Sequence, residues 1–302
     1  MAFDCIVVGG SYSGLAAALQ LARARRKVLV IDGGQRRNRF ASESHGFLGQ
    51  DGRAPGAIVS DGRAQLLAYP NVTWIDGQAA SAERAGDGFG VATADSTVHR
   101  ARRLVLATGV VDRLPEVPGL AERWGRSVFH CPYCHGYELG GGEIGVLAIS
   151  ALSMHHALMA PDWGRTTFFL NDAFAPDSEQ IAQLERRGVA IERTPVAEIR
   201  GEKAEVVLSD GRVFALEGLL TATRVEMASP LAAQLGCAFE ETPMGDIVTT
   251  DMTKETSVAG VFACGDAARA AGSIALAVGD GTMAGAAAHR SMFMREDNAT
   301  AA

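Results

Sequence analysis

The sequence predicts an α/β protein made of two Rossmann-like dinucleotide-binding domains of the three-layer ββα type, with the second domain inserted into the first. Three observations lead to this prediction. The chain opens with an apolar strand, a glycine-rich turn, a helix and a second apolar strand, and a similar β-α-β pattern begins again at "GEIGVLA". The two patterns align as an internal repeat, which sets Gly14 opposite Ser153 and Asp32 opposite Asn171.

Composition limits the class of protein. The 302 residues are 47% hydrophobic and 21% charged, which suits a globular protein with ample core. The net charge of −7 argues against nucleic acid or an anionic membrane as a partner. No apolar run reaches the length of about 18 residues expected of a membrane span. The N-terminal "MAFDCIVVGGSYSG" lacks the basic region of a signal peptide, so we expect a cytoplasmic protein.

The first half of the chain reads as strands around one long irregular stretch. "CIVVGG" and "KVLVID" are buried strands, and "SGLAAALQLARARR" between them is a helix that ends in arginines. "GGQRRNRFASESHGFLGQDGRAPG" follows, and an irregular segment of this length is usually functional. "NVTWIDG", "GFGVATADSTVHR" and "RRLVLATG" are predicted strands, and "VVDRLPEVPGL" reads as a linker.

The second half repeats the alternation of strands and helices. "SALSMHHALMAPD" and "DSEQIAQLERRG" are predicted helices, separated by the strand "TTFFLN". "AEVVLSDGRVFAL" is a predicted hairpin that turns at Asp210-Gly211. A last strand, "GVFACGD", precedes a helix of small residues that runs roughly from Ser273 to Arg295.

The turn "VVGGSYSG" predicts a nucleotide site. It follows the pattern G-x-G-x-x-G except that serine replaces the second glycine, and a helix N-terminus there suits a pyrophosphate. Asp32, at the end of the next strand, suits a ribose hydroxyl and disfavours a 2′-phosphate, so the ligand is FAD or NAD. The alternative is a sheet whose turn merely needs glycine. The predicted cofactor-binding residues here are Gly9, Gly10, Ser11, Ser13, Gly14, Asp32 and Gly33.

Two of the five cysteines have the spacing of a redox pair. Cys131 and Cys134 form a C-x-x-C at a predicted helix start, where a thiolate is stabilised. Cys5, Cys237 and Cys264 lie in apolar contexts and are predicted to be buried. "CPYCH" also fits three other readings: a c-type haem attachment, half of a zinc site and an inert core pair. Neither an export signal nor a second ligand pair supports the first two.

The order of "VVGGSYSG", "LATG", "CPYCHGYE" and "GVFACGD" resembles the low-molecular-weight thioredoxin reductase family of FAD-dependent disulfide oxidoreductases. "CPYCHGYE" and "SHGFLGQDG" look most like its branch of gliotoxin- and holomycin-type dithiol oxidases. The resemblance implies FAD, a homodimer, a discontinuous FAD domain over residues 1–113 and 224–302, and a central domain over 114–223 that carries the cysteines. It adds to the expected FAD contacts Gln50, Ala107, Thr108, Gly109, Gly265 and Asp266.

The same resemblance assigns roles around the cysteine pair. It implies that Cys134 faces the flavin and that Cys131 exchanges with the substrate. His135, directly after the pair, is the implied acid/base, because a histidine titrates near neutral pH. The alternative for His135 is a solvated loop histidine, and His130 is expected to pack or to orient the loop.

The second nucleotide site lacks the features that NADPH requires. Ala148, Ser150 and Ser153 stand where glycines are expected, and their Cβ atoms obstruct a pyrophosphate. No basic residue lies between Thr166 and Gln180 to hold a 2′-phosphate. Such a site either binds weakly or does not use NAD(P)H.

Three functions follow as hypotheses. The first is an FAD-dependent oxidase that converts a substrate dithiol to a disulfide and passes electrons through Cys131 and Cys134 to FAD and then to O2. The second is an NADPH- or ferredoxin-dependent reductase of a thioredoxin-like protein. The third is a flavin redox sensor that does not turn over. The substrate is either a small dithiol or disulfide, or a thioredoxin-like protein.

Overall fold

The computed structural model describes residues 2–294, which divide into two compact units. The first unit holds the residues up to Arg37, Gly56–Val111 and the chain from Val225 onward, and the second holds Asn38–Pro55 and Asp112–Arg224. The domain boundaries predicted at 113 and 224 lie close to this division. Residues 38–55 were assigned to the first domain by sequence, whereas in the structure they pack with the second unit.

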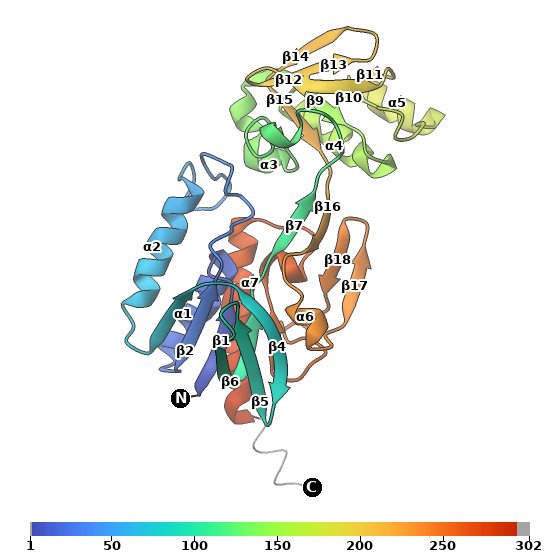
Figure 1. Ribbon diagram of the computed structural model, residues 1–302. Helices are drawn as coiled ribbons and strands as arrows, with labels where there is room; N and C mark the ends of the chain where they lie inside the picture. The colour runs from blue at the N-terminus through green and yellow to red at the C-terminus, as the bar shows by residue number, and fades with distance from the viewer. Residues whose placement is uncertain (1, 295–302) are drawn as a thin grey trace. The chain divides into compact units, whose positions relative to one another are not determined.

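A seven-stranded sheet forms the centre of the first unit (Figure 1). Its order is β3-β2-β1-β6-β5-β4, and β19 pairs with β6. The first four strands of that order and β19 are parallel, while β4 and β5 continue the sheet as antiparallel strands. The bounds are β1 Phe3–Val8, β2 Val28–Asp32, β3 Val72–Asp76, β4 Ala79–Ala85, β5 Gly88–Thr93, β6 Val98–Leu106 and β19 Val261–Ala263.

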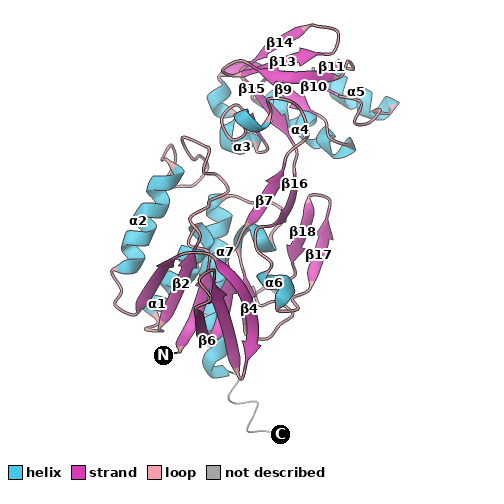
Figure 2. Cartoon of the chain, in the orientation of Figure 1, coloured by secondary structure: helices cyan, strands magenta, loops and turns pink. Residues whose placement is uncertain are grey.

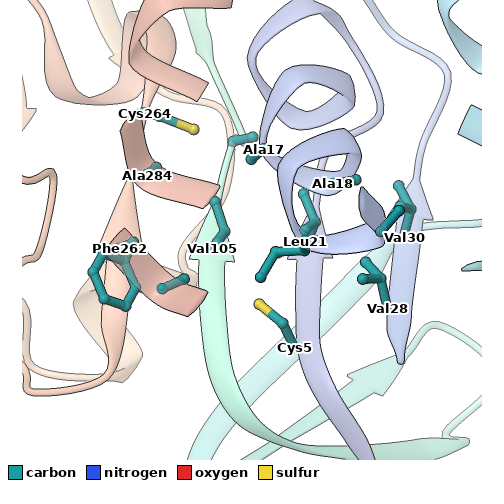
Figure 3. Close-up of a cluster of buried hydrophobic side chains, with 14 of the residues drawn as sticks. Cys5, Ala17, Ala18, Leu21, Val28, Val30, Val105, Phe262, Cys264 and Ala284 are labelled. Atoms are coloured by element: carbon teal, nitrogen blue, oxygen red, sulfur yellow. The ribbon is translucent and has the colours of Figure 1, made fainter. Parts of the chain in front are cut away.

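Helices α1 (Tyr12–Arg23) and α7 (Ile274–Met294) pack together against this sheet. Figure 3 shows Leu21 and its helical neighbours directed at strand residues such as Val28 and Val105. The two helices approach closely because a Cβ at Gly281 would lie 2.0 Å from the Ser13 carbonyl oxygen. The other helices of the unit are α2 (Pro55–Leu67), α6 (Leu231–Gln234) and the 3-10 turn η5 (Gly265–Ala268).

The second unit has three layers. Its five-stranded parallel sheet has the order β11-β10-β9-β15-β8. Ile144 and Val146 of β9 pack with residues of helices α4 (Met154–Met159) and α5 (Ser178–Arg186), while Leu147 packs with residues of a three-stranded antiparallel sheet, β12-β13-β14. Figure 2 shows these helices and this small sheet in the second unit. The strands are β8 Val128–Phe129, β9 Gly141–Leu147, β10 Gly164–Phe169, β11 Ala190–Glu192, β12 Val196–Arg200, β13 Ala204–Leu208, β14 Val213–Leu216 and β15 Gly218–Thr221.

Short helices complete the second unit, and two small sheets complete the chain. The helices are α3 (Pro132–His135), α4 (Met154–Met159) and α5 (Ser178–Arg186), with 3-10 turns η1 (Ala121–Arg123), η2 (Tyr137–Leu139), η3 (Ala151–Ser153) and η4 (Ala160–Asp162). The two-stranded sheets pair β7 (Val110–Arg113) with β16 (Arg224–Met227), and β17 (Phe239–Thr242) with β18 (Gly245–Val248).

The predicted α/β class with two Rossmann-like domains is confirmed, while several individual elements differ from the prediction. The predicted linker contains strand β7. Helix α2 and strand β4 were not predicted. The helix predicted from "SALSMHHALMAPD" is α-helical only over Met154–Met159. The last helix is described to Met294, so its predicted end at Arg295 lies outside the described residues. Within residues 2–294, none of the helices combines the length and apolar composition needed to cross a bilayer.

Candidate functional site

Three glycines close the turn between β1 and α1 and leave no room for side chains. Gly9 has φ +101°, and a Cβ there would lie 2.2 Å from the Ala107 carbonyl oxygen. A Cβ on Gly10 would meet the Trp74 ring at 2.3 Å, and one on Gly14 would lie 1.8 Å from the Gly9 oxygen. The turn is therefore a backbone cradle of the kind that a pyrophosphate needs.

The N-terminus of α1 faces that cradle. Ser11 is the N-cap residue, its side chain makes no capping hydrogen bond, and no acidic residue lies in the first turn. The N–H groups at a helix N-terminus and the positive end of the helix dipole favour an anion at this point. The serine at the second glycine position leaves this arrangement intact.

Asp32, at the end of β2, is held against the same turn. Its Oδ1 accepts hydrogen bonds from the backbone N–H of Gly10 at 3.0 Å and of Gly34 at 3.2 Å. Both donors use one carboxylate oxygen, so Oδ2 is the atom we expect to accept from a ribose hydroxyl. Gly33 has nothing within 4 Å of a Cβ position, so the backbone is open beside this carboxylate.

The ends of β6 and β19 lie side by side near the first turn. Ala107 donates its N–H to the Val8 carbonyl oxygen at 2.8 Å, and Cys264 donates to Leu106 at 3.1 Å. Asp266 follows β19, and its Oδ2 accepts from Arg37 Nη1 at 2.9 Å. These contacts gather the predicted residues of the first unit at the carboxyl ends of its parallel strands; Thr108 and Gly109 follow β6, and Gly265 opens η5.

Two of the predicted cofactor residues differ from the rest in their placement. Ser13 is buried, and a Cβ on Gly265 would lie 2.6 Å from its Oγ, so its side chain packs inside the unit. Any contact of Ser13 with a cofactor would therefore use its backbone. Gln50 belongs to the second unit, where its Oε1 accepts from Arg53 Nη1 at 2.7 Å. Its role at FAD stays a prediction.

Cys131 and Cys134 lie at the start of a single helical turn. Cys131 is the N-cap of α3 with extended backbone, Pro132 occupies the first helical position, and the Cys134 N–H donates to the Cys131 carbonyl oxygen at 3.3 Å. Both thiols are half-buried. A turn of four residues carries little of the dipole of a longer helix, so the predicted thiolate stabilisation by a helix start is small here.

His135 is packed rather than solvated. Its ring stacks on Phe129 with centroids 4.1 Å apart, which argues against a solvated loop histidine. Burial, and next the charge of His45, lower the pKa of His135 to about 4. The sequence-based expectation of titration near neutral pH therefore does not hold, and His135 is a neutral base in the working range.

A histidine from the next helix supports the backbone before the cysteine pair. His156 Nε2 lies 2.7 Å from the His130 carbonyl oxygen, so Nε2 is the protonated nitrogen and donates. Burial lowers the pKa of His156, which agrees with a neutral ring, and its Nδ1 is buried without a hydrogen-bond partner. His130 itself lies 6.3 Å, between ring centroids, from Trp124.

A third histidine reaches this group from the segment Asn38–Pro55. An antiparallel bridge between Ser44 and Arg53 closes the segment into a loop. His45 Nε2 lies 3.4 Å from Glu138 Oε1, and its Nδ1 lies 3.6 Å from Asp51 Oδ2. Across the described part of the chain, no three His, Cys, Asp or Glu side chains gather in a way that could hold a metal ion.

The turn after β9, which corresponds to the second nucleotide site, is filled by its own side chains. Ser153 Oγ accepts from the Ile149 N–H at 3.0 Å, and Ser150 Oγ accepts from the Leu152 N–H at 3.3 Å. Asn171, after β10, accepts the Val196 N–H at 2.8 Å through Oδ1. Two backbone N–H groups of this turn, those of Ile149 and Leu152, are thus already bonded to its own serine hydroxyls.

The other three cysteines are buried, as predicted. Cys5 and Cys264 have no exposed surface, and burial raises the pKa of both thiols, that of Cys264 to about 12. Burial also raises the pKa of Cys237. None of the three is a reactive thiolate at neutral pH.

Residues 3–284 match the family model described as pyridine nucleotide-disulphide oxidoreductase. The chain belongs to this family.

Two relatives of this oxidoreductase show where it lies within the family. It is 33% identical to the thioredoxin reductase sirT of Leptosphaeria maculans, over 94% of this chain and 92% of that protein. An oxidoreductase from Agrobacterium tumefaciens is 56% identical, with a TM-score of 0.94 over 97% of this chain and 99% of that one. The resemblance to the thioredoxin reductase family that the motifs carried is confirmed.

The structure of HlmI is also similar to this oxidoreductase. It is 33% identical, with a TM-score of 0.91 over 99% of this chain and 95% of that one. The predicted closeness to the gliotoxin- and holomycin-type branch is confirmed by this likeness and by sirT. The protein is a thioredoxin reductase-like disulfide oxidoreductase and an FAD-binding flavoprotein.

Sequence reasoning missed three side chains of the cysteine region in this oxidoreductase: His45, His156 and Trp163. His45 lies in "SHGFLGQDG", which was singled out for its resemblance and not for its histidine. Trp163 contacts Tyr133 edge to face at 5.3 Å, and it fills the space that a side chain on Gly136 would need. No sequence signal marked His156 or Trp163, because both reach the cysteines through folding of the second unit.

Proposed function

We propose that this protein is an FAD-dependent dithiol oxidase, which converts a substrate dithiol to a disulfide and delivers the electrons to O2. Cys131 and Cys134 exchange with the substrate, and His135 accepts protons beside them. FAD is held by the domain that comprises residues 1–113 and 224–302, through the cofactor-binding residues that the sequence predicts.

The observation that carries the proposal is the filled turn after β9. The hydroxyls of Ser150 and Ser153 already accept from the N–H groups of Leu152 and Ile149. A pyrophosphate would have to displace both hydroxyls as acceptors, and each hydrogen bond given up in this way contributes about 0.5–1.5 kcal/mol. The absence of basic residues between Thr166 and Gln180 removes the counter-charge for a 2′-phosphate as well. NADPH is therefore a poor electron source for this chain.

Oxidation of the substrate consists of two successive thiol–disulfide exchange reactions. One substrate thiolate attacks Cys131, the Cys131–Cys134 bond breaks, and a mixed disulfide forms. The second substrate thiolate attacks that mixed disulfide and releases Cys131, so the substrate gains one S–S bond and gives up two protons and two electrons. FAD, when bound, supplies a two-electron acceptor that O2 can reoxidise to give hydrogen peroxide.

A half-buried cysteine pair in a largely aromatic setting suits a small apolar dithiol. Tyr133 and Tyr137 are 73% and 86% exposed beside the pair, and they offer ring surface to such a substrate. A thioredoxin-like protein is the alternative partner, and the names of the relatives favour it. We further propose a cytoplasmic homodimer, which analytical ultracentrifugation of the yellow protein would test.

The test adds NADPH, NADH or a small dithiol in turn to the purified protein without oxygen and follows flavin absorbance. We expect bleaching by the dithiol and none by either nicotinamide cofactor. With air, the dithiol should be consumed with equal amounts of O2 and yield peroxide, and a Cys134→Ser variant should not turn over. Fast bleaching by NADPH would instead establish a reductase, and bleaching without sustained consumption of dithiol would establish a sensor.

A further inference from the structure

One continuous segment contacts the cysteine turn at both of its ends. This segment, residues 154–163, comprises α4, η4 and Trp163, and it belongs to the same unit as the cysteine pair (Figure 1). Before the pair, His156 Nε2 lies 2.7 Å from the His130 carbonyl oxygen. After the pair, a Cβ on Gly136 would lie 2.6 Å from Cγ of Trp163. A single stretch of chain therefore packs against the residues that enter and leave the turn.

The turn itself is too short to keep its shape unaided. Helix α3 has four residues, and a helix of that length has too few internal hydrogen bonds to be stable alone. Between the cysteines, the Tyr133 ring meets Trp163 edge to face with centroids 5.3 Å apart. The geometry of the redox pair therefore depends on contacts that segment 154–163 supplies.

The hydrogen bond from His156 acts at the backbone of Cys131. The His130 carbonyl belongs to the same planar peptide group as the Cys131 nitrogen, so fixing the carbonyl fixes the plane through which Cys131 enters the turn. Cys131 is the N-cap of α3 with extended backbone, outside the helical residues. A disulfide forms only within a narrow range of Cα and Cβ separations, so the backbone at this position decides whether the bond can close.

Stability alone does not account for a histidine at position 156. Its Nδ1 is buried without a hydrogen-bond partner, and an unsatisfied buried polar atom is unfavourable. An apolar side chain in α4 would avoid that cost. What the histidine supplies, and an apolar side chain does not, is the Nε2–H donor that reaches His130.

We propose that His156 is a positioning residue of the redox pair. Its hydrogen bond to the His130 carbonyl holds the Cys131 sulfur in the place where it bonds to Cys134. A sulfur that is already held loses less conformational freedom when the bond closes, so the disulfide form is favoured. On closure the two thiols form one S–S bond and give up two protons and two electrons to the disulfide that oxidises them. This inference rests on the proposed exchange at the pair, but not on where the electrons go afterwards.

The test measures the thiol–disulfide equilibrium of the pair on the flavin-loaded protein without oxygen. The protein is equilibrated at neutral pH with mixtures of reduced and oxidised dithiothreitol and quenched in acid, and the thiols at Cys131 and Cys134 are alkylated and counted by mass. Oxidised dithiothreitol takes up the two protons and two electrons that the pair releases.

The variants differ in whether they can donate to the carbonyl. The amide nitrogen of His156→Gln reaches about as far as Nε2, whereas that of His156→Asn is one methylene shorter and does not reach. His155→Asn, at the exposed neighbouring position of the same helix, is the matched control.

We expect His156→Asn to lower the equilibrium constant for disulfide formation at least about threefold, which is about 14 mV for a two-electron couple. His156→Gln keeps the donor and should match the wild type, as should His155→Asn. A merely structural role would lower the melting temperature of both His156 variants and leave the equilibrium constant unchanged. A smaller change in His156→Asn, or an equal change in His156→Gln, overturns the proposal.

His156→Leu keeps the test decisive if His156→Asn loses its flavin or its fold. Leucine fills the position without a donor, so we expect the same change in the equilibrium constant. A wild-type equilibrium constant in His156→Leu overturns the proposal. If the pair opens and closes as expected in a wild type that consumes no O2, the proposed oxidase function fails while the role of His156 stands.

Discussion

The Ser153 hydroxyl accepts the Ile149 backbone N–H at 3.0 Å, and both residues belong to the turn that would otherwise cradle a second nucleotide. A glycine at position 153 would leave that N–H for a phosphate oxygen. The serine instead supplies that N–H with an acceptor from the protein itself. We expect this hydrogen bond to stabilise the second unit.

Removing this hydroxyl should destabilise the protein. Ser153 has no exposed surface, so Ser153→Ala leaves the Ile149 donor without its partner, at a cost of about 1–3 kcal/mol. We expect the melting temperature to fall by about 2–10 °C, measured by flavin fluorescence. Ser178→Ala, at an exposed position of α5, is the control and should melt as the wild type does. An unchanged melting temperature in Ser153→Ala would show that the hydrogen bond is unimportant.

The glycine cradle of the first unit predicts loss of FAD in Gly14→Ala. The new Cβ would lie 1.8 Å from the Gly9 carbonyl oxygen, so the turn and α1 must separate. We expect a protein with less than about a tenth of the wild-type flavin, a loss of over 1.4 kcal/mol in cofactor binding. The flavin-to-protein absorbance ratio measures it. Gly279→Ala, in α7, has open space at the same atom and should stay yellow; full flavin in Gly14→Ala would refute the cradle.

Burial of His135 predicts a stability that depends on pH. Its pKa is about 4 in the folded protein, below the 6.5 of the unfolded chain, so the unfolded state takes up the proton first as pH falls. The stabilisation is fully present above pH 6.5 and is lost between pH 6.5 and about pH 4, by about 1–3 kcal/mol. Unfolding by urea at several pH values should show this slope in the wild type. His135→Gln should flatten it, and an equal slope in both proteins would contradict the expectation.

Loss of the buried charge of Asp280, in α7, should lower the stability of the protein strongly. Its carboxylate is 3% exposed and accepts from Arg269 at 2.8 Å and Lys254 at 2.9 Å. Asp280→Asn leaves two cations without their partner, and breaking a buried pair costs about 3–5 kcal/mol. We expect a sharply lower midpoint of urea unfolding. Glu143→Gln breaks an exposed pair with Arg165 and should change stability by under about 1 kcal/mol; equal effects of the two substitutions would contradict this.

The sequence predicted helices and strands well where the spacing of hydrophobic residues matched only one kind of element. Buried strands such as "KVLVID" and the helix that follows Gly14 appear as predicted, because a strand buried on both faces and a helix opened by glycine need no distant partner to be recognised. Helix α2 was missed because the segment from Pro55 to Leu67 follows a long irregular stretch and has a weak helical pattern.

The structure brings together those predicted site residues whose positions depend on short-range geometry. Gly9, Gly14 and Asp32 lie in one β-α-β unit, and short-range geometry brings them together. The cysteine pair was found because its spacing is local too. The titration of His135 was wrong because it depends on burial against Phe129 and on the charge of His45, which lies far from it in sequence.

By itself the sequence determined the two-domain α/β class, FAD as the cofactor and the C-x-x-C spacing of Cys131 and Cys134. Each of these follows from neighbours along the chain. Only the tertiary structure decided that the loop of His45 packs with the cysteine unit, that His156 supports the backbone before Cys131 and that Ser153 caps its own turn. Burial depends on residues that meet only after the chain has folded, and burial lowers the pKa of His135.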